Sequence, residues 1–307
     1  MRVLASRHFP GPAWERLEDV VVEWPVAGER PGVEALAVVA AKVGEELLDL
    51  FPDLRLVANY GVGYDGIDVE ACARRGVAVT NTPEALGIAT ADLTMALVLA
   101  VRRRIVEGDR FVREGRWAAG WHVGQLMGDE VHGATLGLVG FGRIGRAVAE
   151  RARAFGMRVI YNRRTDRDDA FRELDDLLRE SDVVSIHAPL TGETHGLIDG
   201  RRLALLRDGA AVVNTARGAI LDEDALVREL TSGRLRAGLD VFVHEPNVPE
   251  ALLGLPNVVL QPHVGSATRA TREAATAELV ANIEAVLACR EPPNPVPGSA
   301  TVSSEAP

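Results

Sequence analysis

A glycine-rich turn in the middle of the chain constrains the fold more than any other feature. The stretch LVGFGRIG places Gly140, Gly142 and Gly145 at the spacing G-x-G-x-x-G. It follows an apolar run that predicts a strand and opens a segment with helical spacing, which is the context this pattern needs. The three glycines allow a tight turn, close approach of a pyrophosphate and packing of the helix on the strand. The stretch therefore predicts a dinucleotide-binding turn, with the backbone N–H groups of Arg143 and Ile144 facing the phosphates.

Short apolar runs alternate with helix-like segments on both sides of this turn. The candidate strands are 2–6, 20–24, 35–40, 54–59, 77–81, 134–140, 158–162, 182–188, 209–216, 236–242 and 257–263. One long helix is expected over about 89–114 and a last one over about 267–288. The alternation predicts parallel sheets and an α/β fold with two domains. We expect a doubly wound Rossmann domain (96–267) inserted into a flavodoxin-like substrate domain (1–95 plus 268–307), with the active site in the cleft between them.

Composition and charge exclude several classes of protein. A net charge of −10 argues against a nucleic-acid or anionic membrane surface. The longest apolar run, Leu93–Val101, is far shorter than the roughly 20 residues of a membrane span, and the N-terminus has no apolar signal region. Cys72 and Cys289 are far apart and form no metal spacing, so we expect no metal and a cytoplasmic protein. The one lysine, Lys42, is in no phosphate loop, and the tail from Glu291 is expected to be partly disordered.

Three polar side chains come just after apolar strands of the second series. They are Arg217 in VVNTARG, Glu245 in GLDVFVHEP and His263 in VVLQPHVG. The carboxyl ends of parallel strands line the ligand crevice of such a sheet, so we expect the three to converge. From the residues alone each also has an ordinary interpretation. Arginine accounts for 34 − 1 = 33 residues, Glu245 precedes Pro246 in a loop, and His244 is a competing histidine among seven.

Five ordered motifs give the chain a resemblance to the D-isomer-specific 2-hydroxyacid dehydrogenase family. They are VGYDGID (62–68), GFGRIG (140–145), HAPLTGETHGLI (187–198), NTARGAILDEDAL (214–226) and PHVGSAT (262–268). The resemblance covers nearly the whole chain and is strongest from about Leu54 to Thr271. The run NYGVGYDGID and the segment after it are most similar to the glyoxylate/hydroxypyruvate reductase branch.

The resemblance implies a role for each strand-end residue, and the chemistry is consistent with those roles. His263 is similar to the general acid/base, and Glu245 to the carboxylate that orients the ring and favours its protonated form. Arg217 resembles the residue that binds the substrate carboxylate and polarises its carbonyl. The turn Gly61–Val62–Gly63 resembles the loop whose backbone N–H groups hold that carboxylate, and Asp240 matches a position beside the nicotinamide. The resemblance also assigns to the cofactor site His187, Ala188, Pro189, Thr194, Thr215, Ala216 and Gly265.

The end of the strand after the glycine turn departs from the pattern of NAD-dependent members. Their aspartate position is occupied by Asn162, because 162 − 145 = 17 residues separate it from Gly145. An acid there binds the ribose 2′-hydroxyl and repels a 2′-phosphate, so its loss removes the element that selects NAD. Arg163 and Arg164 could pair with the phosphate, and Thr165 adds a hydroxyl. Since arginine is common in this chain, the missing acid carries most of the prediction that NADP(H) is preferred over NAD(H).

These features together predict an NADPH-preferring reductase of small 2-keto acids, glyoxylate and hydroxypyruvate first, that gives D-2-hydroxy acids and forms a homodimer. Trp121 follows the long helix, where family members commonly form their dimer contact. We expect it either to approach the partner's substrate or to anchor an intersubunit core together with Trp117. The alternatives are an NAD-dependent dehydrogenase of phosphoglycerate, lactate or a phosphonate, and a nucleotide-sensing binding protein. Formate dehydrogenases of this fold carry glutamine at the position of Glu245.

Overall fold

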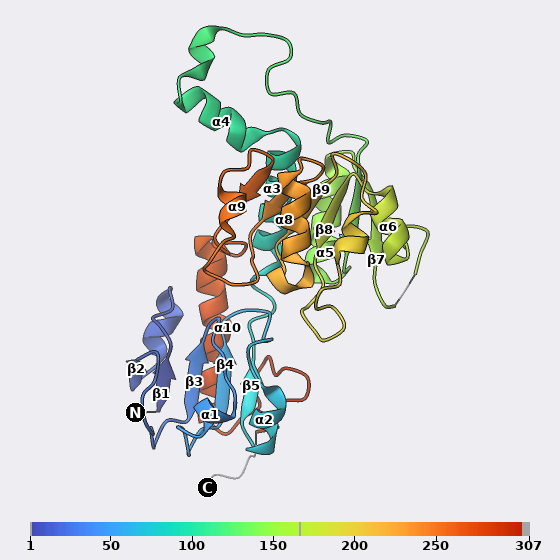
Figure 1. Cartoon of the computed structure of the whole chain (residues 1–307). Coiled ribbons are helices and arrows are strands. Elements are labelled where there is room, and N and C mark those ends of the chain that lie inside the picture. The colour runs from blue at the N-terminus through green and yellow to red at the C-terminus, as the bar shows by residue number, and fades with distance from the viewer. Residues whose placement is uncertain (1, 166, 303–307) are drawn as a thin grey trace. The chain divides into compact units, whose positions relative to one another are not determined.

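The computed structural model describes residues 2–165 and 167–302 of the 307-residue chain. Its contacts divide the chain into two units (Figure 1): Met1–Leu86 with Ser266–Pro307, and the inserted segment Gly87–Gly265. The domain boundary expected at residue 95 lies inside helix α3 (Gly87–Arg102), all of which belongs to the inserted unit. Each unit is a parallel α/β structure and is described by itself.

The first unit is built on a five-stranded parallel sheet with the order β2-β1-β3-β4-β5. Its strands are β1 (Val3–Ala5), β2 (Val20–Val22), β3 (Ala35–Val38), β4 (Leu56–Asn59) and β5 (Ala78–Thr80). This is the flavodoxin-like order 2-1-3-4-5. One face packs against η1 (Pro12–Arg16) and α10 (Arg269–Leu287), and the other packs against α1 (Glu45–Leu48) and α2 (Val69–Arg74).

The C-terminal segment packs on this unit as far as the structure describes it. The backbone N–H of Val296 donates to Val79 O at 3.0 Å, that of Asn81 donates to Asn294 O at 3.2 Å, and the Val296 side chain is buried. This stretch of the tail is therefore ordered, because apolar burial and pairing beside β5 hold it, and the expectation of partial disorder from Glu291 onward stays a prediction. Residues 303–307 lie outside the described part of the chain.

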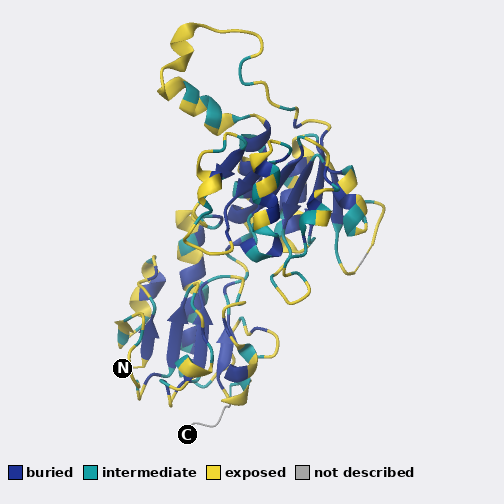
Figure 2. Cartoon of the chain, in the orientation of Figure 1, coloured by how far each residue is buried: buried dark blue, intermediate teal, exposed yellow. Residues whose placement is uncertain are grey.

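The inserted unit is built on a six-stranded parallel sheet with the order β11-β10-β9-β8-β6-β7. Its strands are β6 (Thr135–Val139), β7 (Arg158–Asn162), β8 (Val183–Ile186), β9 (Ala211–Asn214), β10 (Arg236–Leu239) and β11 (Val258–Leu260). Helices α3 and α5 (Arg143–Ala154) cover one face. The other face is covered by α6 (Leu174–Glu180), α7 (Gly200–Leu203), α8 (Glu223–Thr231) and α9 (Glu250–Leu253). The strands are buried on both faces (Figure 2), as the near-continuous apolar runs in the sequence require.

The doubly wound plan places a ligand crevice at one point of this sheet. The chain passes from β6 outward to β7, and then returns to the other side of β6 to form β8. The direction of winding therefore reverses between β6 and β8, and such a switch point opens a crevice at the carboxyl ends of the strands. The glycine turn follows β6, so it lies at the expected edge.

The long helix expected over 89–114 is two helices, α3 and α4 (Ile105–Arg113). Arg104 separates them with φ 53°, a left-handed conformation that cannot continue a right-handed helix. Helix α4 buries none of its residues, and η2 (Arg116–Ala119) follows it. Residues 105–127, called the arm below, stand out from the rest of the inserted unit (Figures 1 and 2). In the described part of the chain, no helix combines the length and apolar character needed to cross a membrane.

Candidate functional site

The glycine turn after β6 has the shape that a dinucleotide pyrophosphate requires. Gly140 has φ 97°, and a Cβ there would lie 2.7 Å from the backbone of His187 and Ala188. A Cβ on Gly145 would lie 2.5 Å from Gly140 O, so both positions exclude any side chain. A Cβ on Gly142 would meet nothing within 4 Å, which leaves open space before the first turn of α5. The predicted phosphate donors are the backbone N–H groups of the first two residues of α5. They lie at the N-terminus of this helix, where the dipole favours an anion.

The loop after β7 carries the residues expected to choose between the two cofactors. Asn162 O accepts a hydrogen bond from Gly140 N–H at 3.0 Å, and Asn162 Nδ2 donates to Arg172 O at 2.9 Å. The Arg163 guanidinium lies over the rings of Tyr161 and Phe141, at 5.6 and 5.9 Å from their centroids. These two rings are stacked with 4.0 Å between centroids.

Two further residues of this loop complete the predicted set. Arg164 forms an ion pair with Glu193, and Thr165 lies next to it in the chain. The strand end therefore carries an amide at the position where the sequence pattern for NAD predicts a carboxylate, with two guanidinium groups beside it.

The predicted cofactor residues after β8 form a closed turn. His187 N–H donates to Val139 O at 2.7 Å, and its Nε2 lies 2.9 Å from Ser185 Oγ. Burial lowers the pKa of His187 to about 4, so the ring is neutral near pH 7. Thr194 Oγ1 donates to Pro189 O at 2.6 Å and accepts from Thr191 N–H at 2.8 Å. The predicted residue Ala188 is brought beside the glycine turn by the close approach of Gly140.

The turn after β9 holds Arg217 through a residue that the sequence reasoning missed. The buried Asn214 side chain donates to Arg217 O at 2.8 Å and accepts from Ala216 N–H at 3.0 Å. Thr215 Oγ1 lies 2.9 Å from Thr94 Oγ1 on α3, which anchors the same turn to the helix layer. An asparagine at a strand end is a known turn signal, so the NTARG stretch already contained this information.

Gly218 brings this turn against the loop after β10. A Cβ at Gly218 would lie 2.1 Å from Phe242 C and 2.4 Å from Val243 N, so only glycine permits this contact. The sequence reasoning also missed Gly218, although it follows Arg217 directly. Its effect is to bring the Arg217 turn next to the loop that contains Glu245.

The predicted acid/base pair is formed in the structure. Glu245 Oε2 lies 2.7 Å from His263 Nδ1, and Glu245 Oε1 accepts from Phe242 N–H at 3.1 Å. Burial acts to raise the pKa of Glu245, but the bonds from His263 and Phe242 and the charges of His263 and Arg217 outweigh it, so the pKa is lowered. Glu245 therefore stays ionised at neutral pH, and His263 keeps Nε2 as the ring nitrogen that can exchange a proton with a substrate.

Asp240 holds the turn on which His263 lies. The side chain is buried, and its two oxygens accept the N–H groups of Val264 and Gly265, each at 2.8 Å. Its carbonyl accepts from His263 N–H at 2.8 Å, and His263 has a left-handed φ of 54°. Burial raises the pKa of Asp240, against these backbone hydrogen bonds. Its placement beside a nicotinamide stays a prediction, whereas its contact with the 263–265 backbone is direct.

The predicted substrate loop, Gly61–Val62–Gly63, follows β4 in the other unit. The Asn59 side chain donates to the carbonyls of Gly61 (3.2 Å) and Gly63 (3.0 Å), and Asn81 donates to that of Val62 (2.8 Å). Gly61 N–H already donates to Thr82 Oγ1 at 2.9 Å. The backbone donors that this turn can offer a carboxylate are therefore those of residues 62 and 63.

The arm contains Trp121, which is 74% exposed, and it carries charged side chains as well as exposed apolar ones. Other exposed apolar side chains of the arm are Ile105, Val106, Val112, Trp117, Val123 and Met127.

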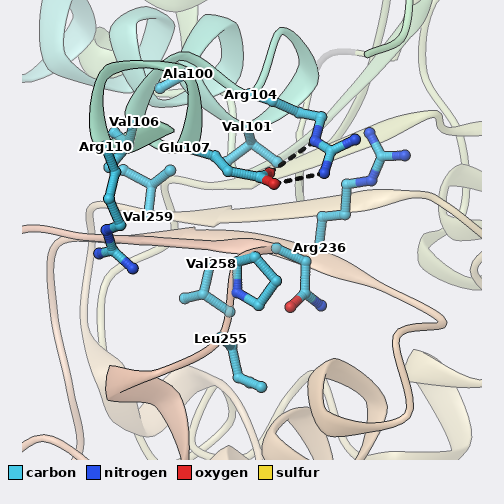
Figure 3. A pocket seen from close by; sticks show the side chains of 12 residues that line it. Ala100, Val101, Arg104, Val106, Glu107, Arg110, Arg236, Leu255, Val258 and Val259 are labelled. Carbon is cyan, nitrogen blue, oxygen red and sulfur yellow. Dashed lines mark hydrogen bonds and ion pairs between the residues drawn. The ribbon is translucent and has the colours of Figure 1, made fainter. Parts of the chain in front are cut away.

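A cavity of about 230 Å³ lies at the base of α4, between α3 and the start of β11 (Figure 3). Arg104 and Glu107 pair on one wall at 2.7 Å, and Val258 and Leu255 lie on the wall opposite. The cavity is at the amino end of β11, whereas His263 follows the carboxyl end, so it is separate from the acid/base pair. Among the described residues, no three or more His, Cys, Asp or Glu side chains are grouped so as to hold a metal ion.

Comparisons with known proteins agree with this geometry. A family model described as "D-isomer specific 2-hydroxyacid dehydrogenase, NAD binding domain" matches residues 95–265. The glyoxylate reductase of Thermococcus litoralis is 49% identical over 285 residues, covering 89% of this chain and 86% of the relative.

Two solved structures are similar over most of their length. An NADPH-dependent glyoxylate/hydroxypyruvate reductase from Sinorhizobium meliloti, solved with NADP and malonate, has a TM-score of 0.91 and 36% identity over 100% of this chain and 99% of the other. The D-lactate dehydrogenase of Aquifex aeolicus, solved with NAD and lactic acid, has a TM-score of 0.83 and 29% identity over 94% and 95%.

Proposed function

The chain belongs to the D-isomer-specific 2-hydroxyacid dehydrogenases, which are NAD(P)-dependent oxidoreductases, and we propose that it reduces glyoxylate and hydroxypyruvate to their 2-hydroxy acids with NADPH. The observation that carries this proposal is the His263–Glu245 pair, with Arg217 held beside it at the carboxyl edge of a nucleotide-binding sheet. The relatives named as glyoxylate reductases support the choice of substrates. For hydroxypyruvate the expected product is the D-isomer.

Each of the three residues has a defined task in this reaction. Reduction of a 2-keto acid adds a hydride to C2 and a proton to the carbonyl oxygen, and a bound nicotinamide would supply the hydride. His263 donates the proton from Nε2, while the Glu245 carboxylate at Nδ1 stabilises the protonated ring before the transfer. Arg217 binds the substrate carboxylate and polarises the carbonyl, which suits a planar guanidinium with several donors. In the oxidative direction the neutral ring accepts the proton.

A substrate panel tests the proposed reaction. The purified protein is assayed for NADPH oxidation with glyoxylate, hydroxypyruvate, pyruvate and phosphonoacetaldehyde, and the products are resolved on a chiral column. We expect the highest kcat/KM for glyoxylate or hydroxypyruvate and D-glycerate from the latter. Absence of turnover with every acid would contradict the proposal and favour a nucleotide-sensing binding protein.

The preference for NADPH rests on the loop after β7. Asn162 places no negative charge at the strand end, and Arg163 and Arg164 lie next to it. Asn162→Asp restores the acid, and its carboxylate should repel the 2′-phosphate and bind the ribose hydroxyls of NADH. We expect the ratio of kcat/KM for NADPH to that for NADH to exceed one in the unmodified protein and to fall about tenfold or more in the variant. A ratio below one in the unmodified protein would contradict the proposed preference.

We also propose a homodimer formed through the arm, in a reducing cytoplasmic setting. The support for the dimer is the exposed apolar surface of the arm, because apolar patches of this kind mark protein interfaces. Val123→Asp should therefore shift the sedimentation coefficient to that of a monomer, whereas Val22→Asp, at an exposed valine of the first unit, should not. Trp121→Ala in the dimer shows whether this side chain affects substrate preference.

The cytoplasmic setting is supported by the two free thiols, Cys72 and Cys289.

A further inference from the structure

The two arginines of the loop after β7 have different partners. Arg163 lies over the stacked rings of Tyr161 and Phe141. Arg164 reaches across to the turn after β8 and pairs with Glu193. Both members of this pair are 75% exposed, so an incoming anion can reach the guanidinium and the carboxylate alike.

The position of Glu193 is determined by its turn. Thr194 N–H and His195 N–H both donate to Thr191 O, at 3.1 and 2.9 Å, and the Thr194 hydroxyl bonds to both Pro189 and Thr191. Glu193 therefore lies on a backbone held by several hydrogen bonds, immediately before the predicted cofactor residue Thr194. The turn therefore places a carboxylate within reach of Arg164.

From this geometry we infer that Glu193 is a specificity-determining residue, which limits the preference for NADP(H) by competing with the 2′-phosphate for Arg164. The inference rests on the proposal that the 162–165 loop meets the adenosine ribose. Position 162 lacks an acid, and Glu193 on the neighbouring turn takes over part of its effect. The Glu193 carboxylate acts on the Arg164 guanidinium and not on the ribose.

The expected effect is moderate. An exposed ion pair contributes little because water and salt screen it, so its removal should change phosphate binding by about threefold to tenfold. The Debye length falls from about 10 Å at 0.1 M salt to about 3 Å at 1 M. The effect of Glu193 should therefore be largest at low ionic strength and should decline toward none at 1 M salt.

Binding of nucleotide fragments tests the inference without turnover. Adenosine 2′,5′-bisphosphate carries the 2′-phosphate and AMP lacks it, and calorimetry gives the dissociation constant of each. Glu193→Gln should lower the dissociation constant of the bisphosphate by about threefold to tenfold at low salt and leave that of AMP unchanged. The ratio of kcat/KM for NADPH to that for NADH should rise by the same factor.

Two further variants show whether the effect passes through Arg164. Glu173→Gln is the matched control, because Glu173 also pairs with an exposed arginine next to this loop, Arg167 at 2.8 Å, and its loss changes the net charge equally. We expect no change in the bisphosphate constant for this control. In an Arg164→Ala background Glu193→Gln should have no effect, since the carboxylate then has no guanidinium to hold.

The outcomes separate this inference from the proposed cofactor preference. An equal gain in Glu173→Gln, a gain that persists without Arg164, or weaker bisphosphate binding in Glu193→Gln would each overturn the inference. If the unmodified protein binds AMP and the bisphosphate equally, and Glu193→Gln then favours the bisphosphate, the proposed preference fails and the inference stands. If the unmodified protein favours the bisphosphate and Glu193→Gln changes nothing, the inference alone fails.

Discussion

Two parts of the carboxyl edge of the inserted sheet, called here the β9–β11 edge and the β7 edge, hold their functional groups in different ways. At the ends of β9, β10 and β11, backbone hydrogen bonds and buried side chains position each group: Asn214 binds both sides of its turn, and Asp240 binds two consecutive N–H groups beside His263. At the end of β7, the partly buried Arg163 lies over an aromatic stack and the exposed Arg164 forms a surface ion pair. The proposed proton transfer therefore relies on the partly exposed His263–Glu245 pair, which lies on turns fixed by buried side chains, whereas the proposed choice of cofactor relies on side chains that can change one at a time.

This difference predicts how the two edges respond to substitution. Changes at the β9–β11 edge should reduce catalysis by orders of magnitude or disturb the fold. Changes at the β7 edge should alter the ratio between two cofactors and leave the chemical step intact.

A large effect on catalysis is expected at Arg217. Arg217→Ala removes the charge and the donors that bind the substrate carboxylate, so kcat/KM for hydroxypyruvate should fall about 10²- to 10³-fold. Arg217→Lys keeps the charge and loses the planar fork, so its loss should be smaller but still at least about tenfold. Arg207→Ala, at an exposed arginine paired with Asp182, is the control and should have normal kinetics. Near-normal kinetics in both Arg217 variants would show that the β9 turn does not hold the substrate.

A smaller effect is expected from Gly218→Ala, which tests whether the two loops must touch. The added methyl group would lie about 2.1 Å from Phe242 C, so the loops after β9 and β10 must separate. We expect urea denaturation to show a loss of about 1–3 kcal/mol in the free energy of unfolding. The value of kcat/KM should fall about tenfold, because displacement of Arg217 misaligns the substrate.

Gly254→Ala is the matched control for this substitution, since a Cβ there would meet nothing within 4 Å. Equal behaviour of the two variants would mean that the close approach of the loops is not needed for function.

A further prediction concerns the pH dependence of stability at the β8 turn, where no change in catalysis is at issue. Burial lowers the pKa of His187 from 6.5 to about 4, so between these values the unfolded chain binds more protons than the folded one. Stability is then complete above about pH 6.5 and falls as the pH drops toward 4, by about 3 kcal/mol in total. His187→Gln should remove this part of the pH dependence, as measured by the difference in unfolding free energy between pH 7 and pH 4.5. An identical slope in both proteins would contradict the assignment of a neutral ring with a lowered pKa.

The architecture could be predicted because it depends on periodic patterns. Each predicted strand appears in one of the two parallel sheets, and the glycine spacing correctly identified the turn after β6. The long helix was wrongly predicted as continuous. The break lies at Arg104, which has a left-handed backbone, and the sequence has no glycine or proline at this position to indicate a break. Burial of Val296 likewise depends on a contact with β5 that is remote in sequence.

The candidate site divides in the same way. Arg217, Glu245 and His263 could be identified because they are chemically distinctive and follow strands, and the structure brings His263 and Glu245 into contact. Asn214 and Gly218 were missed, since their function is to position the backbone and is visible only in three-dimensional contacts. The pairing of Arg164 with Glu193 joins two loops that no local pattern connects.

The most direct test of the whole account is the effect of removing the His263 imidazole on turnover and on cofactor binding together. In His263→Ala we expect kcat/KM for hydroxypyruvate to fall about 10³-fold, while the dissociation constant of NADPH changes by less than about twofold. His244→Ala, next to Glu245 but outside the pair, should retain normal values. Turnover in His263→Ala close to that of the unmodified protein would show that the pair at the ends of β10 and β11 does not carry the proton, and the account would be wrong.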